Sequence, residues 1–290
     1  MEPVFQSMFV DPGDRSPLEF DGTLISGRWC DGWLRSGSGD IWPVRAGIPD
    51  FVRRAVDGAR WQYAGVRSLL NNGQYRRNWA GQNGLAGDSS PFVKEVRGAA
   101  LAGEPIVDVA SGPGGGAMPF ILQLNPDAHV LAVDAGTPVL HGWREFLASV
   151  RRGSGACFAG LDFARAPLRD DSVAVMTSIA GFSSIGNDPS RAWREAARVL
   201  RPGGRVLAME MWWDRDGCRR LAEALDDPRI ASSDGLAIRD RIQAAGLHIE
   251  AEWAGAGRPV GAHDNELAAK AVELGIEVWL RQGRYVVRKG

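Results

Sequence analysis

The sequence predicts an α/β protein in which a mostly parallel sheet is covered by helices on both faces and preceded by a small β module. Two observations support this prediction. After Gly103, short apolar segments alternate regularly with amphipathic helical segments, which is typical of βαβ units. The first 52 residues are rich in Gly, Pro, Asp and Ser and contain only short apolar pieces, which indicates strands joined by tight turns.

We expect three parts in the chain. Residues 1–52 form the small β module, residues 53–102 form a mostly helical lid or linker, and residues 103–290 form the domain that holds the large sheet. The helical part is interrupted around residues 80–91 by a stretch rich in Gly and Ser, which predicts a loop.

The strand candidates of the third part are apolar runs that lie between helical segments. They cover residues 105–110, 129–135, 156–163, 172–182, 205–213 and 248–255. A helix starting at Pro189 is well delimited, because Asp188 can cap it and the Pro-Gly-Gly run at 202–204 ends it. The last segment, centred on Gln282 and Gly283, predicts a terminal hairpin or a closing strand.

The composition argues against several classes of protein. With 34 basic and 35 acidic side chains the net charge is -1, so no overall positive field would gather nucleic acid or anionic lipid. The three cysteines are odd in number and far apart, which does not fit a disulfide framework and favours a cytoplasmic location. No apolar stretch approaches the roughly 20 residues of a membrane-spanning helix, so we expect neither a membrane span nor a secretory signal.

The most informative segment is IVDVASGPGGG, which runs from Ile106 to Gly116. An apolar strand contains an acidic residue near its end and leads into a glycine-rich turn that opens a helix. The backbone can therefore approach a ligand where side chains would collide. The next strand ends in Asp134, 18 residues after the last glycine of the turn, where a carboxylate can accept both hydroxyls of a ribose. Together these features predict a nucleoside-binding site.

The turn also fits a second class of nucleotide-binding protein. Gly112, Gly114 and Ala117 satisfy the looser G-x-G-x-x-G/A pattern of dinucleotide-binding folds. The spacing of the glycines alone therefore leaves hydride transfer open.

Two further segments distinguish these possibilities. They are GLDFARAPLRDDSVAVM at 160–176 and EAARVLRPGGRVLAME at 195–210. With them, the chain from about Glu104 to Met211 resembles the class I S-adenosylmethionine (SAM) dependent methyltransferases. The resemblance implies a Rossmann-like three-layer sandwich with a mostly parallel seven-stranded sheet. It also implies SAM as the cofactor and S-adenosylhomocysteine as its product.

The resemblance assigns cofactor-binding roles residue by residue. The glycines would pass under the methionine part of SAM, Asp134 would hold the ribose, and Asp162 would bind the adenine amino group. Phe163 would lie against the adenine ring, and Ser178 and Ile179 would lie near the methyl donor. The full set is Asp108, Gly112, Gly114, Gly116, Asp134, Asp162, Phe163, Ser178 and Ile179.

The segment 18–52 is similar to the small zinc-ribbon module of certain rRNA guanine methyltransferases and of tRNA-methyltransferase activator proteins. The closing WPVRAGIP motif of that module is present at 42–49, but of its four metal-binding cysteines only Cys30 has a possible counterpart. One thiolate cannot hold a structural zinc ion, which takes four ligands. We therefore expect a metal-free module in which tryptophans fill the space of the metal, namely Trp29, Trp33 and Trp42.

The composition indicates the class of molecule that accepts the methyl group. The near-neutral charge favours a small molecule over nucleic acid, and the 11 tryptophans suggest an aromatic one. Two alternatives stay open, an rRNA or tRNA base methyltransferase and a SAM-binding regulatory protein without transferase activity. The sequence does not determine the oligomeric state.

Several residues are candidates for the acceptor side of the site. Tyr75 and Trp79 are four residues apart on a predicted helix and would form an aromatic lid, while Trp212 and Trp213 would form the opposite wall. No catalytic base is assigned. The candidates for a base are Glu210, Asp214, His141 and His263.

Overall fold

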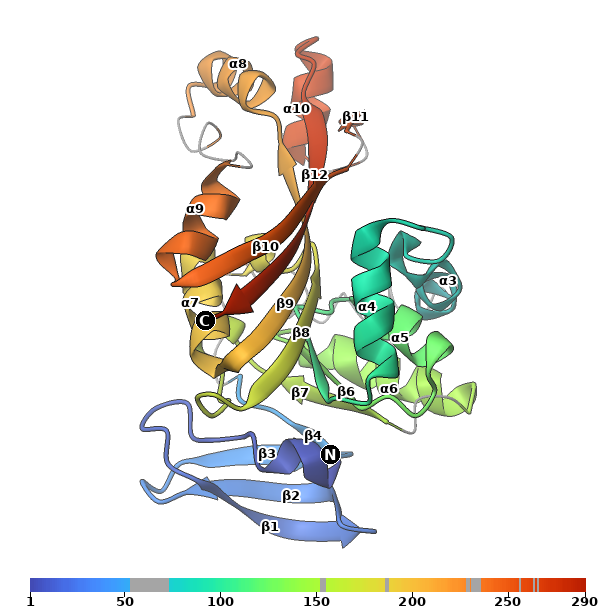
Figure 1. The fold of residues 1–290 in the computed structure, drawn as a ribbon, viewed down its shortest axis with the longest axis vertical. Helices are drawn as coiled ribbons and strands as arrows, with labels where there is room; N and C mark the ends of the chain where they lie inside the picture. The colour runs from blue at the N-terminus through green and yellow to red at the C-terminus, as the bar shows by residue number, and fades with distance from the viewer. Residues whose placement is uncertain are drawn as a thin grey trace.

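The computed structural model describes residues 1–52, 73–151, 155–185, 188–227, 230, 236–255, 257–262, 264 and 266–290. In this part of the chain, two sheets are present, a four-stranded sheet near the N-terminus and a larger sheet covered by helices (Figure 1).

The larger sheet has the strand order β10-β12-β9-β8-β5-β6-β7, and the short β11 pairs with β12 outside this path. Strands β5 to β9 are parallel to one another, whereas β12 is antiparallel to both β9 and β10. This arrangement confirms the predicted mostly parallel, seven-stranded α/β fold. The strands are β5 Ile106–Val109, β6 Val130–Asp134, β7 Ala156–Gly160, β8 Val173–Ile179, β9 Leu200–Trp213, β10 Leu247–Ala254, β11 Arg258–Pro259 and β12 Trp279–Lys289.

Helices cover both faces of this sheet (Figure 1). One face packs against α4, α5 and α6, and the other packs against α7 and α9. Strands β9 and β12 extend past the others and carry α8 and α10, which form a small core of their own. The helices are α3 Gln74–Gly81, α4 Pro91–Leu101, α5 Met118–Leu124, α6 Thr137–Ser149, α7 Pro189–Val199, α8 Arg215–Leu225, α9 Leu236–Ala244 and α10 Glu266–Glu273, with short 3-10 turns η1 Gln82–Gly84, η2 Phe163–Arg165 and η3 Phe182–Ser184.

Local sequence signals explain the start of α7. The Asp188 side chain accepts a hydrogen bond from the Ser190 amide, and Pro189 occupies the first turn, as predicted.

Among the described residues, no helix has both the length and the apolar character needed to cross a bilayer.

The N-terminal residues form α1 Pro3–Gln6 and an antiparallel sheet of β1 Leu18–Ile25, β2 Arg28–Ser36, β3 Ile41–Arg45 and β4 Ile48–Pro49. This module is joined directly to the larger domain, because the Phe51 amide donates to the Gly160 carbonyl of β7 at 2.8 Å. Aromatic residues of the module belong to the same core as β5, β7 and α7. The two sheets therefore share one hydrophobic core.

The tryptophans of the module do not all lie in that core. Trp29 and Trp42 are buried as predicted, but Trp33 is 46% exposed, so the prediction for Trp33 is wrong. Trp29 and Trp33 are four residues apart on β2, and on a regular strand such residues would share a face. The pairing of β2 with β1 shifts register between Gly22 and Leu24, so the two side chains differ in burial.

The C-terminal segment is one long strand and not a hairpin. Strand β12 pairs with β9 without interruption from Leu280 to Arg288. Gly283 is needed there for packing, because a Cβ atom at this position would lie 2.7 Å from the Trp212 ring. The glycine therefore marks a close side-chain contact within the sheet rather than a turn.

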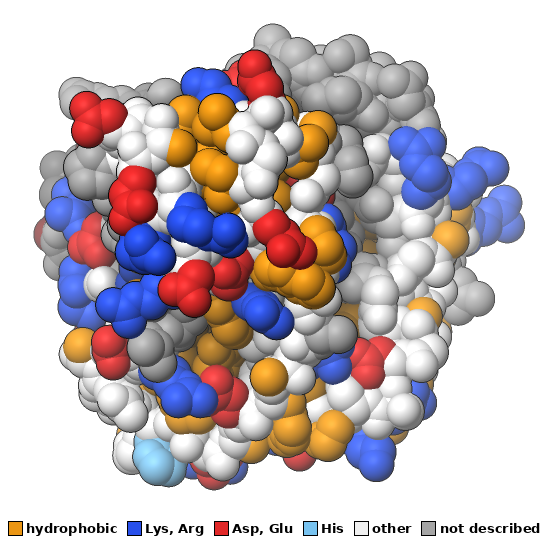
Figure 2. Space-filling view, turned by 90° about the horizontal axis from the view of Figure 1, so that it is seen from above, with side chains coloured by type: hydrophobic (Ala, Val, Ile, Leu, Met, Phe, Trp, Pro, Cys, Tyr) orange, Lys and Arg blue, Asp and Glu red, His pale blue; other side chains and the backbone are white. Residues whose placement is uncertain are grey.

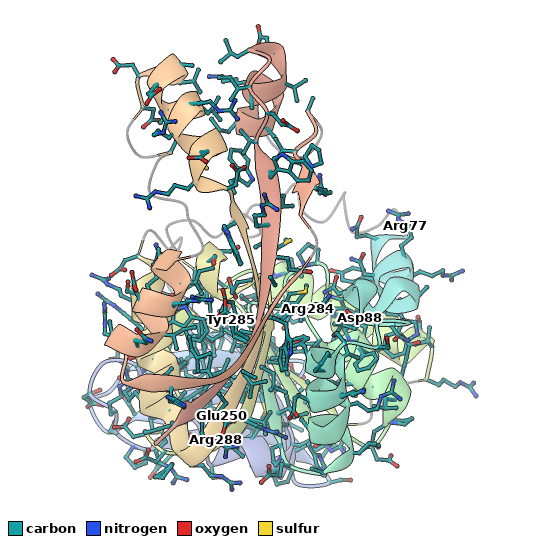
Figure 3. All side chains as sticks on the ribbon, turned by 45° about the horizontal axis from the view of Figure 1, so that its top comes forward. Arg77, Asp88, Glu250, Arg284, Tyr285 and Arg288 are labelled. Atoms are coloured by element: carbon teal, nitrogen blue, oxygen red, sulfur yellow. The ribbon has the colours of Figure 1, made fainter. Side chains whose placement is uncertain are left out.

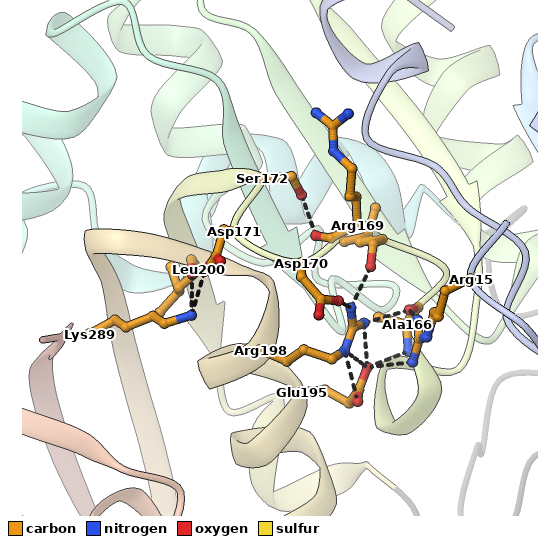
Figure 4. Close-up of polar contacts among 11 residues, drawn as sticks. Arg15, Ala166, Arg169, Asp170, Asp171, Ser172, Glu195, Arg198, Leu200 and Lys289 are labelled. Carbon is orange, nitrogen blue, oxygen red and sulfur yellow. Dashed lines mark hydrogen bonds and ion pairs between the residues drawn. The ribbon is translucent and has the colours of Figure 1, made fainter. Parts of the chain in front are cut away.

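Arg198 on α7 organises the segment that joins the module to the domain (Figure 4). Its guanidinium donates to the carbonyls of Ala166 and Leu168 at 2.9 and 2.7 Å, and it pairs with Glu195 and Asp170. Its side chain is only 21% exposed. Leu168 in turn forms a backbone bridge with Phe9 of the module.

Replacing Arg198 with Ala is expected to lower the free energy of unfolding by about 2–4 kcal/mol, because the buried Leu168 carbonyl loses its donor and the Ala166 carbonyl and Glu195 carboxylate each lose one of theirs. Arg201→Ala is the matched control, since its pair with Glu104 lies at the surface and should contribute less than about 1 kcal/mol. Urea unfolding of both variants measures the difference. Equal effects would show that the Arg198 network contributes no more than a surface ion pair.

Candidate active site

A pocket of about 790 Å³ opens at the carboxyl ends of the central parallel strands. Ligand sites of open α/β sheets form at this edge. The pocket brings together many of the residues predicted from the sequence for cofactor binding. These are Gly112, Gly114, Asp134, Asp162, Phe163 and Ile179.

The glycine-rich turn between β5 and α5 forms one wall of the pocket. Gly112 and Gly115 have φ values of 54° and 78°, which L-residues rarely adopt. A Cβ atom on Gly115 would lie 2.6 Å from the Trp143 ring of α6, and the Trp143 indole donates to the Gly112 carbonyl at 3.2 Å. The turn is therefore held from behind, with its backbone facing the pocket.

Asp134 lies at the end of β6 opposite this turn. One carboxylate oxygen accepts from the Gly112 amide at 2.9 Å, and the other accepts from the Gly136 amide at 2.7 Å. The side chain is 8% exposed, and burial raises its pKa above the ordinary value of an aspartate. Each carboxylate oxygen keeps a lone pair for a hydroxyl group of a ligand in the pocket.

Asp162 and Phe163 follow β7 on the same side of the pocket. The Asp162 side chain caps η2 by accepting from the Ala164 amide at 2.9 Å. Phe163 is almost fully buried and contacts Phe182 edge to face at 5.8 Å. Asp162 and Phe163 thus line one pocket together, and their roles toward an adenine ring stay a prediction.

Asp108 is buried beneath the glycine turn and does not line the pocket, so the structure does not support direct contact with a cofactor. Its carboxylate accepts from the Thr177 hydroxyl at 2.6 Å and from the backbone amides of Ala117 and Met118 at 3.2 Å. Burial raises the pKa of Asp108 to about 6. Its role is to fix the start of α5 against β8.

Gly116 and Ser178 also lie behind the pocket wall rather than in it. The Gly116 Cα packs so closely on Asp108 that an added Cβ atom would lie 2.1 Å from the carboxylate. The Ser178 hydroxyl is fully buried and donates to the Val109 carbonyl at 3.2 Å. Both residues shape the site without facing a ligand.

The predicted aromatic lid does not line the pocket. Tyr75 is buried against α6, where its hydroxyl donates to the Val139 carbonyl at 3.0 Å and its ring contacts Trp143 edge to face. Trp79 of α3 packs near Phe146, which also lies on α6. The remaining part of the predicted lid, residues 53–72, lies outside the described residues.

Trp212 and Trp213 do not form the opposite wall. Trp212 packs on the main core and Trp213 on the small core of α8 and α10. Their neighbour Met211, 40% exposed, lines the pocket instead, together with Met209. Side chains alternate along a strand, so Met209 and Met211 share a face that the sequence motif did not indicate.

Several pocket residues come from segments without a recognised motif. Gln282 of β12 is paired in register with Met211, and Asn83 of η1 donates to the Gly116 carbonyl at 2.7 Å. Ser183 and Ile185 follow β8. The loop predicted around residues 80–91 is the sequence signal that includes Asn83.

An ion pair supports the β12 side of the pocket. Arg284 and Asp88 are 2.7 Å apart and each side chain is 18% exposed (Figure 3). Arg284 also lies 3.5 Å from the Gln282 side-chain oxygen. The loop before α4 is thereby tied to β12 beside the pocket.

The candidate bases differ in their surroundings. Glu210 is fully buried behind Ser183, and burial raises its pKa to about 7. Asp214 caps α8 and accepts from the Gly217 amide at 2.9 Å. Neither Asp214 nor His141 lines the pocket, and His263 lies outside the described residues. Within the described ranges, no cluster of three or more His, Cys, Asp or Glu side chains is arranged to hold a metal ion.

The central part of the chain is similar to known proteins. Residues 107–208 match the family described as "Methyltransferase domain". Over 109 residues, 38% of this chain, the sequence is 30% identical to ubiquinone/menaquinone biosynthesis C-methyltransferase UbiE of Hahella chejuensis, of which it covers 43%. Over 114 residues, 39% of this chain, it is 32% identical to arsenite methyltransferase of Halobacterium salinarum, of which it covers 29%. The chain thus spans less than half the length of these relatives.

A solved structure shows the same fold. It is phosphoethanolamine N-methyltransferase 2 of Haemonchus contortus, solved in complex with phosphomonomethylethanolamine and S-adenosylhomocysteine. The match covers 81% of this chain and 60% of the chain in that structure. The TM-score is 0.51 at 14% identity. The comparisons confirm the class I methyltransferase fold, and the family match supports SAM as the cofactor. They give no support for a zinc-ribbon relationship of the first 52 residues.

Proposed function

We propose that this protein is a SAM-dependent methyltransferase that acts on a small molecule. The observation that carries the proposal is that Asp134 and Asp162, two carboxylates from successive strands, line one pocket with the glycine turn. This pocket lies within the segment that matches methyltransferase domains.

SAM supplies a methyl group on a positively charged sulfur, so the protein's task is to bind, orient and exclude water. In the proposed complex, the turn at Gly112 and Gly114 lies under the methionine part and Asp134 accepts hydrogen bonds from the ribose. Asp162 binds the adenine amino group, and Phe163 lies against the adenine ring. Ile179 at the end of β8 then faces the methyl donor.

The remaining wall of the pocket suits a small and largely apolar acceptor. Ile185, Met209 and Met211 supply flexible apolar surface, and Gln282 supplies a hydrogen-bonding amide. An aromatic ring with one or more polar substituents fits this chemistry. A pocket wall of this kind, open to a second ligand, also argues against a protein that only binds SAM.

The described residues on the face shown in Figure 2 do not favour RNA as the acceptor. On the face shown in Figure 2, most Lys and Arg side chains lie beside Asp and Glu side chains with hydrophobic side chains between them, and one small group of cationic side chains lies apart at the right edge. A phosphate-binding track would need neighbouring cationic side chains without such interruption.

Isothermal titration calorimetry with SAM and with NAD tests the cofactor part of the proposal. We expect one SAM to bind per chain and NAD to show no measurable binding. Both cofactors use this type of glycine turn, so the two titrations distinguish methyl transfer from hydride transfer. S-adenosylhomocysteine should bind at the same site and compete with SAM. Binding of NAD without SAM would contradict the proposed function and favour hydride transfer.

A further inference from the structure

Ser183 and Glu210 form a hydrogen-bonded pair beside the pocket that cofactor binding does not require. Ser183 lines the pocket on η3, and its hydroxyl donates to a Glu210 carboxylate oxygen at 2.5 Å. Glu210 is fully buried and also accepts from the backbone amides of Phe182 and Ser183 at 3.2 and 3.0 Å. A buried carboxylate is therefore separated from the pocket by a single hydroxyl group.

We propose that Ser183 and Glu210 form a proton relay that removes the hydroxyl proton of the methyl acceptor, and hence that the acceptor is a small hydroxyl compound methylated on oxygen. This inference rests on the proposed SAM-dependent function. Ser183 is the catalytic residue, because it touches the acceptor. Glu210 acts through Ser183.

The backbone arrangement fixes the relay in one direction. Met209 and Met211 line the pocket, and the alternation of β9 directs Glu210 to the opposite face, beneath η3. The hydrogen of the Ser183 hydroxyl is committed to Glu210, so the lone pairs of its oxygen are free to accept a hydrogen bond from an acceptor. The two backbone amides hold the carboxylate in place during the transfer.

The electrostatics of Glu210 suit a base at neutral pH. Burial raises its pKa to about 7, while the bonds from Ser183 and Phe182 and the charge of Arg241 on α9 oppose that rise. Tyr285 on β12 also faces Glu210, and burial raises the pKa of Tyr285, so its hydroxyl stays neutral. General-base catalysis is most effective when the pKa lies near the working pH.

The step is balanced in atoms and electrons. The acceptor O–H bond breaks, and its proton passes to the Ser183 oxygen as the Ser183 proton passes to Glu210. An O–CH₃ bond forms from an oxygen lone pair, and the S–CH₃ bond of SAM breaks with its electron pair left on sulfur. Glu210 ends neutral and returns its proton to solvent through Ser183. No oxidant or further reactant is needed.

Methyl transfer from labelled SAM to two phenols tests the relay. 4-Methylphenol has the pKa of a tyrosine side chain, about 10, and needs a base, whereas 4-nitrophenol is a stronger acid that is largely ionised at about pH 8, where both rates are compared, and needs none. Ser183→Ala should lower kcat for 4-methylphenol by roughly 10²–10⁴-fold and leave 4-nitrophenol within a few-fold. Glu210→Gln should give the same change in the ratio of the two rates.

Ser184→Ala is the matched control, because the Ser184 hydroxyl donates to the Ala180 carbonyl and not to a carboxylate. It should leave the ratio of the two rates unchanged. In the wild type, kcat for 4-methylphenol should rise with pH through about 7, because only ionised Glu210 accepts the proton, and this rise should be absent in Glu210→Gln.

An equal loss for both phenols in Ser183→Ala would assign the pair a purely structural role and overturn the relay. A protein that binds SAM in calorimetry but methylates neither phenol would overturn the hydroxyl acceptor, while the SAM-binding part of the proposed function would stand. A protein that binds no SAM would instead overturn the proposed function itself.

Discussion

Replacing Asp134 with Ala is expected to lower the affinity for SAM by roughly 100-fold or more. A hydrogen bond to a charged group contributes about 1.5–3 kcal/mol, and the carboxylate is expected to accept from two ribose hydroxyls. The substitution also removes the partner of the Gly112 and Gly136 amides. The glycine turn then loses its anchor on β6, which adds to the loss of affinity. Titration calorimetry at neutral pH measures the change.

Two further variants separate the causes of that loss. Asp134→Asn keeps one acceptor oxygen in nearly the same volume and should lose less affinity than the Ala variant. Asp127→Ala removes an exposed carboxylate from the turn before β6 and should bind SAM like the wild type. Unchanged SAM affinity in Asp134→Ala would exclude this residue as the ribose ligand.

The order of the elements in the larger domain follows from sequence patterns that local physics determines. A buried parallel strand is a short apolar run, and the helix that follows carries its own capping residues, as Asp188 and Pro189 do for α7. The glycine turn and Asp134 could be located for the same reason. Their chemistry depends on backbone conformation and on the end of one strand, both of which are local.

The direction of a buried polar side chain cannot be predicted in this way. Asp108 occupies the position expected of a ligand-binding acid, but its carboxylate points beneath the turn to Thr177 of β8, far away in the sequence. Ser178 likewise bonds to Val109 on the neighbouring strand. Only the pairing of β5 with β8 determines where these groups point.

The acceptor side depends even more on long-range pairing. Gln282 reaches the pocket because β12 inserts between β9 and β10, which aligns it with Met211. Ser183 belongs to a turn whose position depends on the buried carboxylate of Glu210. None of these residues carries a local pattern, and the tryptophans that suggested a wall pack into cores instead.

Gly116→Ala is expected to lower the free energy of unfolding strongly, because the new methyl group would collide with Asp108 and the backbone would also be strained. Gly116 has a φ of 56°, which costs an L-residue about 1–2 kcal/mol. A Cβ atom there would lie 2.1 Å from the Asp108 carboxylate, which is fully buried. The carboxylate must shift, and its bonds from Thr177 and Met118 weaken, which should add roughly 2–3 kcal/mol.

Gly203→Ala isolates the strain from the collision. Gly203 has a φ of 72°, but a Cβ atom there would meet nothing within 4 Å. It should therefore lose only about 1–2 kcal/mol of unfolding free energy, against roughly 3–5 kcal/mol for Gly116→Ala. Urea unfolding at neutral pH compares the two variants. If they are equally destabilised, the contact between Gly116 and Asp108 is not what holds the glycine turn on β5. If Gly116→Ala costs more and also binds SAM more weakly, the buried Asp108 acts on the cofactor through the backbone that it supports.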